Sequence, residues 1–191
     1  MAKYLAVYCG AASGINPEYA DQTAALGQLM AKAGIHLVYG GGRVGLMGVL
    51  ADAVLKNGGE VVGVIPDFLY QREVGHDGVT ELIKVDSMHE RKRIMFEKAD
   101  AFLALPGGFG TLDELFEMLT WSQLQLHKKP VGLLNMLGFY DGMLQHVNVM
   151  QSEGFLHTSV KDLLVIGNNA HDLLSLMLSQ VVEHTSELDK M

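Results

Sequence analysis

Short apolar runs alternate with longer segments of helical period along most of this chain, and this alternation limits the folds that the chain can adopt. The runs occupy residues 4–9, 35–40, 60–65, 80–85, 101–106, 130–135 and 163–167. Most of them are continuous in Val, Ile and Leu, which is typical of strands that are buried on both faces of a sheet. We therefore expect seven buried strands.

Five segments with helical spacing lie between these runs, at residues 17–34, 44–59, 87–100, 111–126 and 139–154. The first has Pro17 near its start and Gly34 just past its last periodic residue, as a helix often does. This succession predicts the α/β class, with a doubly wound, mostly parallel, Rossmann-like sheet and helices on both faces. One stretch, residues 66–78, breaks the rhythm, and we expect it to be a mobile loop near the functional site.

Composition narrows the class of protein. The chain has 191 residues, of which 49% are hydrophobic and 19% charged, as expected for one globular domain. We predict that this domain spans residues 1–182 and that residues 183–191 form a loose tail. No apolar run approaches the roughly 18 residues of a membrane span, and no signal-like segment is present, so we expect a cytoplasmic protein.

Charge and cysteine content exclude further classes. The formal net charge of -8 argues against a general nucleic-acid or anionic-membrane surface. The single cysteine, Cys9, excludes an intrachain disulfide and a cysteine metal cluster. The eight histidines show no H-x-x-x-H or H-E-x-x-H spacing, so we predict no metal.

Three glycine-bearing turns follow three of the predicted strands, at residues 9–14, 40–48 and 106–111. Ligands of open parallel sheets bind beyond the carboxyl ends of the strands, so three such turns on one edge indicate a shared ligand site. A single turn of this kind is more often structural, because glycines also serve turns and helix caps. No P-loop and no G-x-G-x-x-G occur, so a dinucleotide cofactor is disfavoured.

The third turn, "PGGFGT", is the best candidate for a phosphate cradle. Its glycines let backbone N–H groups face a ligand at a helix N-terminus, and Thr111 offers a hydroxyl. Glu114 follows about one helical turn later, roughly 5 Å along the axis, which is about the step from a nucleotide's phosphate to its ribose. The alternative is a capping box between Thr111 and Glu114, and spacing alone does not separate the two interpretations. Asp113 is a weaker candidate because it points about 100° away around the helix.

The helix before this strand carries the basic segment "SMHERKR". Met88, Arg91, Lys92 and Met95 share one helical face, so one or two cations could face the same cleft. The alternative is a solvated charged face in which these cations pair with nearby glutamates. Taken alone, the basic segment fits that alternative better.

The helix predicted over residues 111–126 has two apolar faces. We expect Leu112, Leu115, Phe116 and Leu119 to form its core stripe. A second face carries Glu114, Met118, Trp121 and Gln125. An exposed Trp and Met next to a ligand edge often mark a partner surface, so we predict a homodimer that buries Trp121 and Met118.

Taken together, "SMHERKRIM" and "PGGFGTLDE" make the chain resemble the Lonely Guy (LOG) family of cytokinin riboside 5'-monophosphate phosphoribohydrolases. The family signature is PGGxGTxxE, preceded by a helix with an M-x-x-R-K core. The matching residues are Pro106, Gly107, Gly108, Gly110, Thr111 and Glu114 for the first motif, and Met88, Arg91 and Lys92 for the second. The likeness covers most of the chain up to about residue 156. In this family the first turn is often richer in serine, whereas here Ala11 and Ala12 precede Ser13.

The resemblance implies a Rossmann-like enzyme, usually dimeric, that needs no cofactor. It would hydrolyse the N-glycosidic bond of AMP or a cytokinin riboside 5'-monophosphate to free base and ribose 5-phosphate. The family's catalytic pair corresponds to Arg91 and Glu114. Members are often labelled lysine decarboxylases, but the sequence has no motif for that activity and no obvious pyridoxal-phosphate lysine.

These observations together define a candidate site. Glu114 would stabilise positive charge at C1' and orient water, Arg91 would hold the phosphosugar, and the turns would cradle the phosphate. The predicted substrate-binding residues are Ser13, Gly41, Gly42, Gly45, Met88, Lys92, Gly107, Gly108, Gly110 and Thr111. Two alternatives stay open: a non-catalytic nucleotide-binding or carrier module, and transfer of the sugar to another base.

Overall fold

The computed structural model describes residues 4–188, with side chains described up to Val181. Seven parallel strands form one sheet in the order β4-β3-β2-β1-β5-β6-β7. The strands are β1 (Tyr4–Tyr8), β2 (His36–Tyr39), β3 (Val61–Pro66), β4 (Glu81–Val85), β5 (Ala101–Ala104), β6 (Val131–Leu134) and β7 (Val165–Gly167). All seven predicted strands are confirmed, as is the parallel doubly wound fold.

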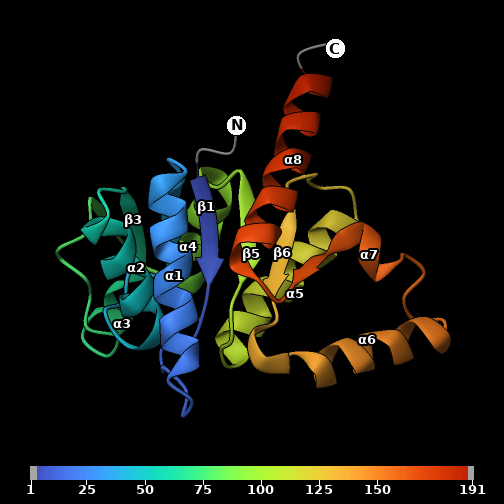
Figure 1. Ribbon diagram of the computed structural model, residues 1–191, viewed down its shortest axis with the longest axis horizontal. Coiled ribbons are helices and arrows are strands. Elements are labelled where there is room, and N and C mark those ends of the chain that lie inside the picture. The colour runs from blue at the N-terminus through green and yellow to red at the C-terminus, as the bar shows by residue number, and fades with distance from the viewer. Residues whose placement is uncertain (1–3, 189–191) are drawn as a thin grey trace.

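The helices connect these strands and cover the sheet (Figure 1). They are α1 (Glu18–Lys32), α2 (Gly45–Lys56), α3 (Asp67–Tyr70), α4 (Met88–Lys98), α5 (Phe109–Gln123), α6 (Asp141–Ser152), α7 (Val160–Leu163) and α8 (Ala170–Leu188), with a 3-10 turn at Met136–Gly138. The five predicted helices correspond to α1, α2, α4, α5 and α6. Our sequence reading missed α8, although its buried positions 173, 174, 177 and 181 have helical spacing.

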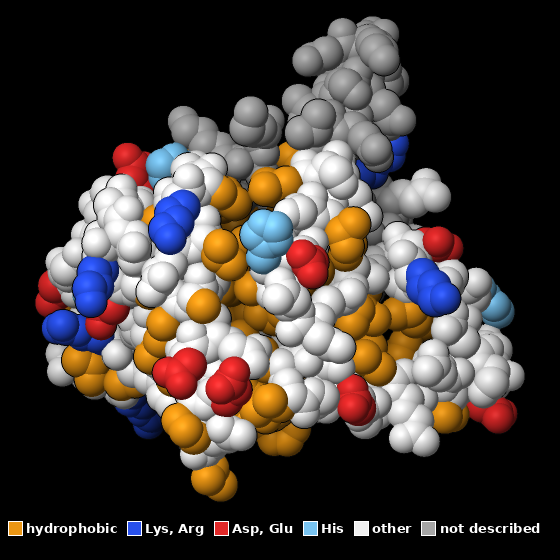
Figure 2. Space-filling view, in the orientation of Figure 1, with side chains coloured by type: hydrophobic (Ala, Val, Ile, Leu, Met, Phe, Trp, Pro, Cys, Tyr) orange, Lys and Arg blue, Asp and Glu red, His pale blue; other side chains and the backbone are white. Residues whose placement is uncertain are grey.

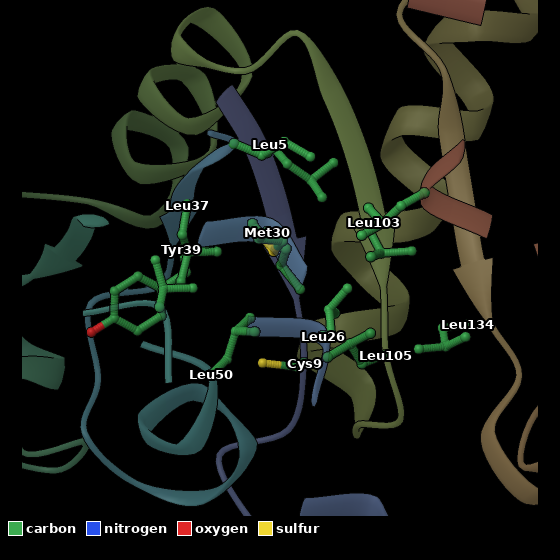
Figure 3. Packing of buried hydrophobic residues seen from close by; sticks show 14 of the residues in the cluster. Leu5, Cys9, Leu26, Met30, Leu37, Tyr39, Leu50, Leu103, Leu105 and Leu134 are labelled. Atoms are coloured by element: carbon green, nitrogen blue, oxygen red, sulfur yellow. The ribbon is translucent and has the colours of Figure 1, made fainter. Parts of the chain in front are cut away.

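The sheet lies between two helical layers, each with its own core. Side chains alternate along β1, so that Leu5, Val7 and Cys9 pack under α1, α2 and α8. Ala6 and Tyr8 instead face the core beneath α4, α5 and the segments after β6. Figure 3 shows the first core, in which Leu26 and Met30 of α1 meet side chains from the sheet and α2.

The strand order reverses between β1 and β5, which pair with each other at the centre of the sheet. Tyr8 at the end of β1 lies opposite Ala104 at the end of β5. The turns that follow these two strands therefore flank the switch point, where open α/β sheets bind ligands. The N–H of Gly10 in the first turn donates to the carbonyl of Pro106 in the third, at 3.0 Å, so the two turns are joined directly.

The inward face of α5 differs from the expected one. Its buried residues are Thr111, Glu114, Leu115 and Met118, which have the i, i+3, i+4, i+7 spacing of one helical stripe. Met118 is only 1% exposed inside its own chain, whereas Phe116 is 37% exposed. The placement of Met118 on a partner-facing surface was therefore wrong, because this stripe packs on the sheet.

Trp121 packs on α4 within its own chain. Its ring makes an edge-on contact with Phe96, with 5.0 Å between the ring centroids. The predicted tail at residues 183–191 falls entirely where side chains are not described. Helix α8 extends to Leu188, and residues 189–191 lie outside the described part, so the boundary at 182 stays a prediction.

Candidate active site

A cleft with two lobes opens over the switch point. The first, the acidic lobe, has a volume of about 270 Å³ and is lined by Cys9, Gly10, Ala11, Met47, Leu69, Glu73, Met88, Arg91, Gly108, Gly110, Thr111 and Glu114. The second, the apolar lobe, has a volume of about 430 Å³ and includes Ser13, Tyr19, Leu46, Gly107 and Phe139. Gly10, Ala11 and Gly108 line both lobes. In Figure 1 the arrows of β1 and β6 point toward the lower edge of the molecule, and Figure 2 shows hydrophobic side chains along that edge.

The third glycine turn starts α5 without a side-chain cap. Gly108 is the N-cap residue, in an extended conformation, and Thr111 lies inside the first helical turn. Thr111 therefore is not the N-cap, and the capping-box interpretation of Thr111 and Glu114 was wrong. The N–H groups at the start of this helix meet the acidic lobe next to Gly108 and Gly110, which is a ready site for an anion. A Cβ on Gly107 would overlap the Thr111 side chain, so glycine is required there.

Glu114 projects from the second turn of α5 into the acidic lobe and is 8% exposed. The pKa of this carboxyl is raised from 4.5 to about 7. Burial is the largest cause, Arg91 and Lys92 oppose it, and Asp113 and Glu73 add to it. Among the described residues, Glu114 forms no ion pair within 4.0 Å. A carboxyl group that titrates near neutrality inside a cleft is suited to acid–base or charge-stabilising chemistry.

Arg91 reaches the same lobe from the first turns of α4. This helix begins after Ser87, whose hydroxyl accepts a hydrogen bond from the N–H of Glu90 at 3.2 Å. Arg91 is 6% exposed, and its Nε is buried without a hydrogen-bond partner. A Cβ on Gly40 would overlap the Arg91 guanidinium, so the first residue of the second turn must be glycine for Arg91 to lie there. The buried, incompletely paired guanidinium indicates an anionic ligand.

Glu73 is a site residue that sequence reasoning missed. It lines the acidic lobe, its Oε2 is buried without a hydrogen-bond partner, and burial raises its pKa. Glu73 lies in the stretch 66–78, so the prediction that this stretch borders the cleft is confirmed. The particular residue had no signal in the sequence, because only the docking of this stretch brings Glu73 next to Arg91.

The second glycine turn holds that stretch in place. The N–H of Arg43 donates to the carbonyls of Glu73 and Val74, at 3.0 and 2.9 Å, and the N–H of His76 donates to the carbonyl of Gly41 at 2.9 Å. Gly42 forms an isolated antiparallel bridge with Gly75. Gly45 has φ near 59° and packs against the backbone of the first turn.

The predicted site residues thus divide into three groups. Met88, Arg91, Gly108, Gly110, Thr111 and Glu114 meet in the acidic lobe, and Ser13 and Gly107 lie in the apolar lobe. Gly41, Gly42 and Gly45 line neither lobe, because their backbones contact neighbouring loops. Lys92 also lines neither lobe, and its Nζ lies 3.2 Å from both Asp113 and Glu117.

No helix in the described part of the chain is long and apolar enough to cross a membrane. Within the same part, no group of three or more His, Cys, Asp or Glu side chains is arranged to hold a metal ion. Cys9 is buried at the base of the acidic lobe, and burial raises the pKa of its thiol, so it is not a reactive thiolate.

Comparison with solved structures shows a shared fold. The molybdenum cofactor carrier protein of Chlamydomonas reinhardtii superposes with a TM-score of 0.71 at 18% identity, covering 96% of this chain and 99% of that one. The molybdenum cofactor binding protein of Rippkaea orientalis gives 0.69 at 23% identity, covering 94% and 97%. At these identities the likeness concerns the fold alone.

Comparison by sequence is more specific. A family model described as "Possible lysine decarboxylase" matches residues 47–177. Cytokinin riboside 5'-monophosphate phosphoribohydrolase LOG2 of Arabidopsis thaliana is 44% identical over 187 residues, covering 98% of this chain and 88% of that protein. The LOG enzyme of Oryza sativa subsp. japonica is 47% identical over 180 residues, covering 94% and 74%. The chain therefore belongs to the LOG family of cytokinin riboside 5'-monophosphate phosphoribohydrolases.

Proposed function

We propose that this protein hydrolyses the N-glycosidic bond of an adenine-type nucleoside 5'-monophosphate, AMP or a cytokinin riboside 5'-monophosphate, to free base and ribose 5-phosphate. One observation carries the proposal. A buried carboxyl group with a pKa near 7, Glu114, shares a lobe with an incompletely paired guanidinium, Arg91, at the N-terminus of α5.

The helix N-terminus sets the position of the substrate. Its N–H groups at Gly108 to Thr111 bind the phosphate through hydrogen bonds and the helix dipole. Glu114 lies one turn further along α5, roughly 5 Å down the axis. The sugar of a nucleotide anchored in this way reaches the Glu114 carboxylate, while a carboxylate in the first turn would oppose the phosphate itself.

The chemistry follows from charge development at the sugar. As the C1'–N bond breaks, its electron pair leaves with the base and C1' becomes cationic, as in other glycoside cleavages. The ionised Glu114 stabilises that charge and orients a water molecule. The oxygen of the water bonds to C1', and the balance of the reaction places the proton of the water on the departing base. No cofactor is needed for this step.

Arg91 and Glu73 complete the lobe. Arg91 makes charged contacts with the phosphosugar and favours the ionised form of Glu114, since opposite charges stabilise each other in a buried site. Glu73 supplies a second acceptor, suited to a sugar hydroxyl or to an N–H of the base. Met88 and the glycine turns at residues 9–14 and 106–111 complete the binding set, with Lys92 in a supporting position.

The main alternative is a carrier or binding module without turnover. The fold alone permits it, because carrier proteins share this architecture. The buried Glu114 favours the hydrolase, since a carboxylate close to the sugar would weaken ground-state binding of an anionic nucleotide.

We further propose that the enzyme works in the cytoplasm as a homodimer. The family resemblance supports a dimer, as do the large apolar side chains that α5 and the loop after it leave exposed.

The test is base release by the purified protein from a panel of nucleoside 5'-monophosphates. We expect adenine from AMP, and Glu114→Gln should lower turnover by about 100-fold or more while AMP affinity stays within a few fold. Gln keeps the size of the side chain but cannot supply the negative charge. Arg91→Ala should weaken both binding and turnover, because it removes a contact already made in the ground state.

Two controls make the result decisive. Adenosine should be a poor substrate, since the cradle cannot anchor it without a phosphate. An added acceptor base should not be converted into a nucleotide, which separates hydrolysis from sugar transfer. Tight AMP binding without release of adenine would instead support the carrier module.

A further inference from the structure

An ion cluster lies beside the acidic lobe without lining it. The Nζ of Lys92 on α4 is 3.2 Å from Asp113 Oδ2 and 3.2 Å from Glu117 Oε2, both on α5. The side chains of Lys92 and Glu117 are only 16% and 24% exposed, whereas that of Asp113 is 61% exposed, so the cluster is mostly buried on the Lys92–Glu117 side. Lys92 directly follows Arg91, and Asp113 directly precedes Glu114, so two of the three members of the cluster are chain neighbours of a proposed catalytic residue.

A second contact between the same helices lies one turn further along. The rings of Phe96 of α4 and Trp121 of α5 meet edge to face, and each is four residues past a member of the cluster. Helices α4 and α5 therefore meet through two successive contacts, which we call rungs. The ionic rung, Lys92 with Asp113 and Glu117, lies at the cleft end, and the aromatic rung, Phe96 with Trp121, lies beyond it. The ionic rung is the closer of the two in sequence to Arg91 and Glu114.

We propose that Lys92, Asp113 and Glu117 are positioning residues that fix the spacing and the relative charge of Arg91 and Glu114. This inference rests on the proposed function and refines it, because it assigns Lys92 to the support of the catalytic pair rather than to the substrate. While the Lys92 ammonium group bridges Asp113 and Glu117, it does not point toward the substrate.

The charges of the cluster also act on the ionisation of Glu114, which packing alone would not do. Arg91 and Lys92 of α4 favour the Glu114 carboxylate, whereas Asp113 on its own helix and Glu73 from the opposite wall disfavour it. Tyr8 of β1 and Cys9, the next residue, also lie close to Glu114, and both stay neutral because burial raises their pKa values. The two partners of one ion pair thus act on Glu114 in opposite directions.

The experiment compares Lys92→Met and Asp113→Asn in the full-length protein, with AMP as substrate, over pH 5 to 9. Lys92→Met should move the acid limb of kcat/KM to higher pH and lower kcat by about 10- to 100-fold, as expected for a misplaced catalytic group. Asp113→Asn should move the same limb to lower pH. Lys92→Arg should restore most of kcat, since it keeps the charge and both partners.

Two matched variants separate positioning from stability. Arg93→Met removes a positive charge from the next residue of α4, where Arg93 pairs with Glu97 on the surface, and it should leave the acid limb in place. Trp121→Leu loosens the aromatic rung and should lower the melting temperature without moving the limb. If either control moves the limb as far as Lys92→Met does, or if Lys92→Met and Asp113→Asn move it in the same direction, the inference is overturned.

A direct titration keeps this test independent of the proposed function. The ¹³C resonance of the Glu114 carboxyl, assigned by its loss in Glu114→Gln, should titrate at higher pH in Lys92→Met and at lower pH in Asp113→Asn. A wild-type protein that releases no base would remove the proposed function, yet this titration would still report on the cluster. Unchanged titration in both variants would refute the cluster's role even in an active enzyme.

Discussion

Glu114 combines two opposing requirements, because the chemistry needs its charge and the fold disfavours that charge. Its pKa of about 7 lies above the ordinary 4.5. Between these values the folded state binds a proton that the unfolded state has already lost, so folding stability falls as pH rises through this window. Above pH 7 the carboxyl is ionised in both the folded and the unfolded state, and its burial lowers the folding stability by its full amount.

The first prediction at this scale is that Glu114→Gln stabilises the protein at high pH. At pH 8 the variant should be more stable by up to roughly 3 kcal/mol, from about 1.4 kcal/mol per pKa unit. At pH 5 the wild-type carboxyl is mostly protonated and resembles Gln, so the difference should nearly vanish. Thermal unfolding at both pH values measures this, and an equal difference at the two would contradict the assigned pKa.

The residues of the site were predictable to different degrees. Arg91 and Glu114 stood out because they belong to motifs that match a known family. Gly40 and Glu73 did not, because the need for each arises only when separate segments meet in three dimensions. Gly41, Gly42 and Gly45 were predicted to bind phosphate, but a glycine-rich turn fits equally well against another loop.

Among the structural elements, the stretch 66–78 links the edge of the sheet to the acidic lobe. His76 is 3% exposed, and its Nδ1 accepts a hydrogen bond from the N–H of Gly78 at 3.2 Å. Its Nε2 therefore carries the proton and donates to Asp52 of α2 at 2.9 Å. This side chain fastens the stretch that carries Glu73 and Leu69 into the cleft.

We predict that His76→Ala loosens this stretch. The variant should lose roughly 1 to 2 kcal/mol of stability through its missing hydrogen bonds, and KM for AMP should rise several-fold because Glu73 is less well held. Limited proteolysis within residues 71–78 and steady-state kinetics measure both effects. Asp52→Asn keeps an acceptor for Nε2 and serves as the milder control. Unchanged cleavage in His76→Ala would show that backbone contacts alone hold the stretch.

The elements themselves were mostly predictable, and the exceptions have physical reasons. Apolar runs identified all seven strands, because the five inner strands are almost wholly buried and tolerate few polar residues. The expectation of burial was wrong for the edge strands, since β4 exposes Glu81 and Lys84 and β7 exposes Ile166. Helix α5 was placed correctly but rotated wrongly, because it carries apolar residues on both of its faces. Periodicity cannot decide which of two apolar faces packs on the sheet.

For the whole molecule, the reversal of strand order between β1 and β5 explains why distant turns form one cleft. That reversal cannot be inferred from periodicity, which gives the order of elements along the chain but not across the sheet.

The observed orientation of α5 also changes the predicted dimer surface. Met118 is buried in its own chain, so any partner must meet side chains that remain exposed. In the described part of the chain these include Phe116 at 37%, Leu124 at 62% and Leu126 at 66%.

The last prediction is that these side chains of α5 and its following loop lie in a homodimer interface. Large apolar side chains that a helix and the loop after it leave exposed are more stable when a second copy covers them. Light scattering at micromolar concentration should give about twice the chain mass of 20.8 kDa. Phe116→Glu should shift the protein toward the monomer, because it places a charge in an apolar contact. Phe68→Glu is the matched control, since Phe68 is 55% exposed on α3, which follows β3 in the other half of the sheet. A wild-type monomer at this concentration would refute the dimer, and dissociation by Phe68→Glu alone would move the interface to α3.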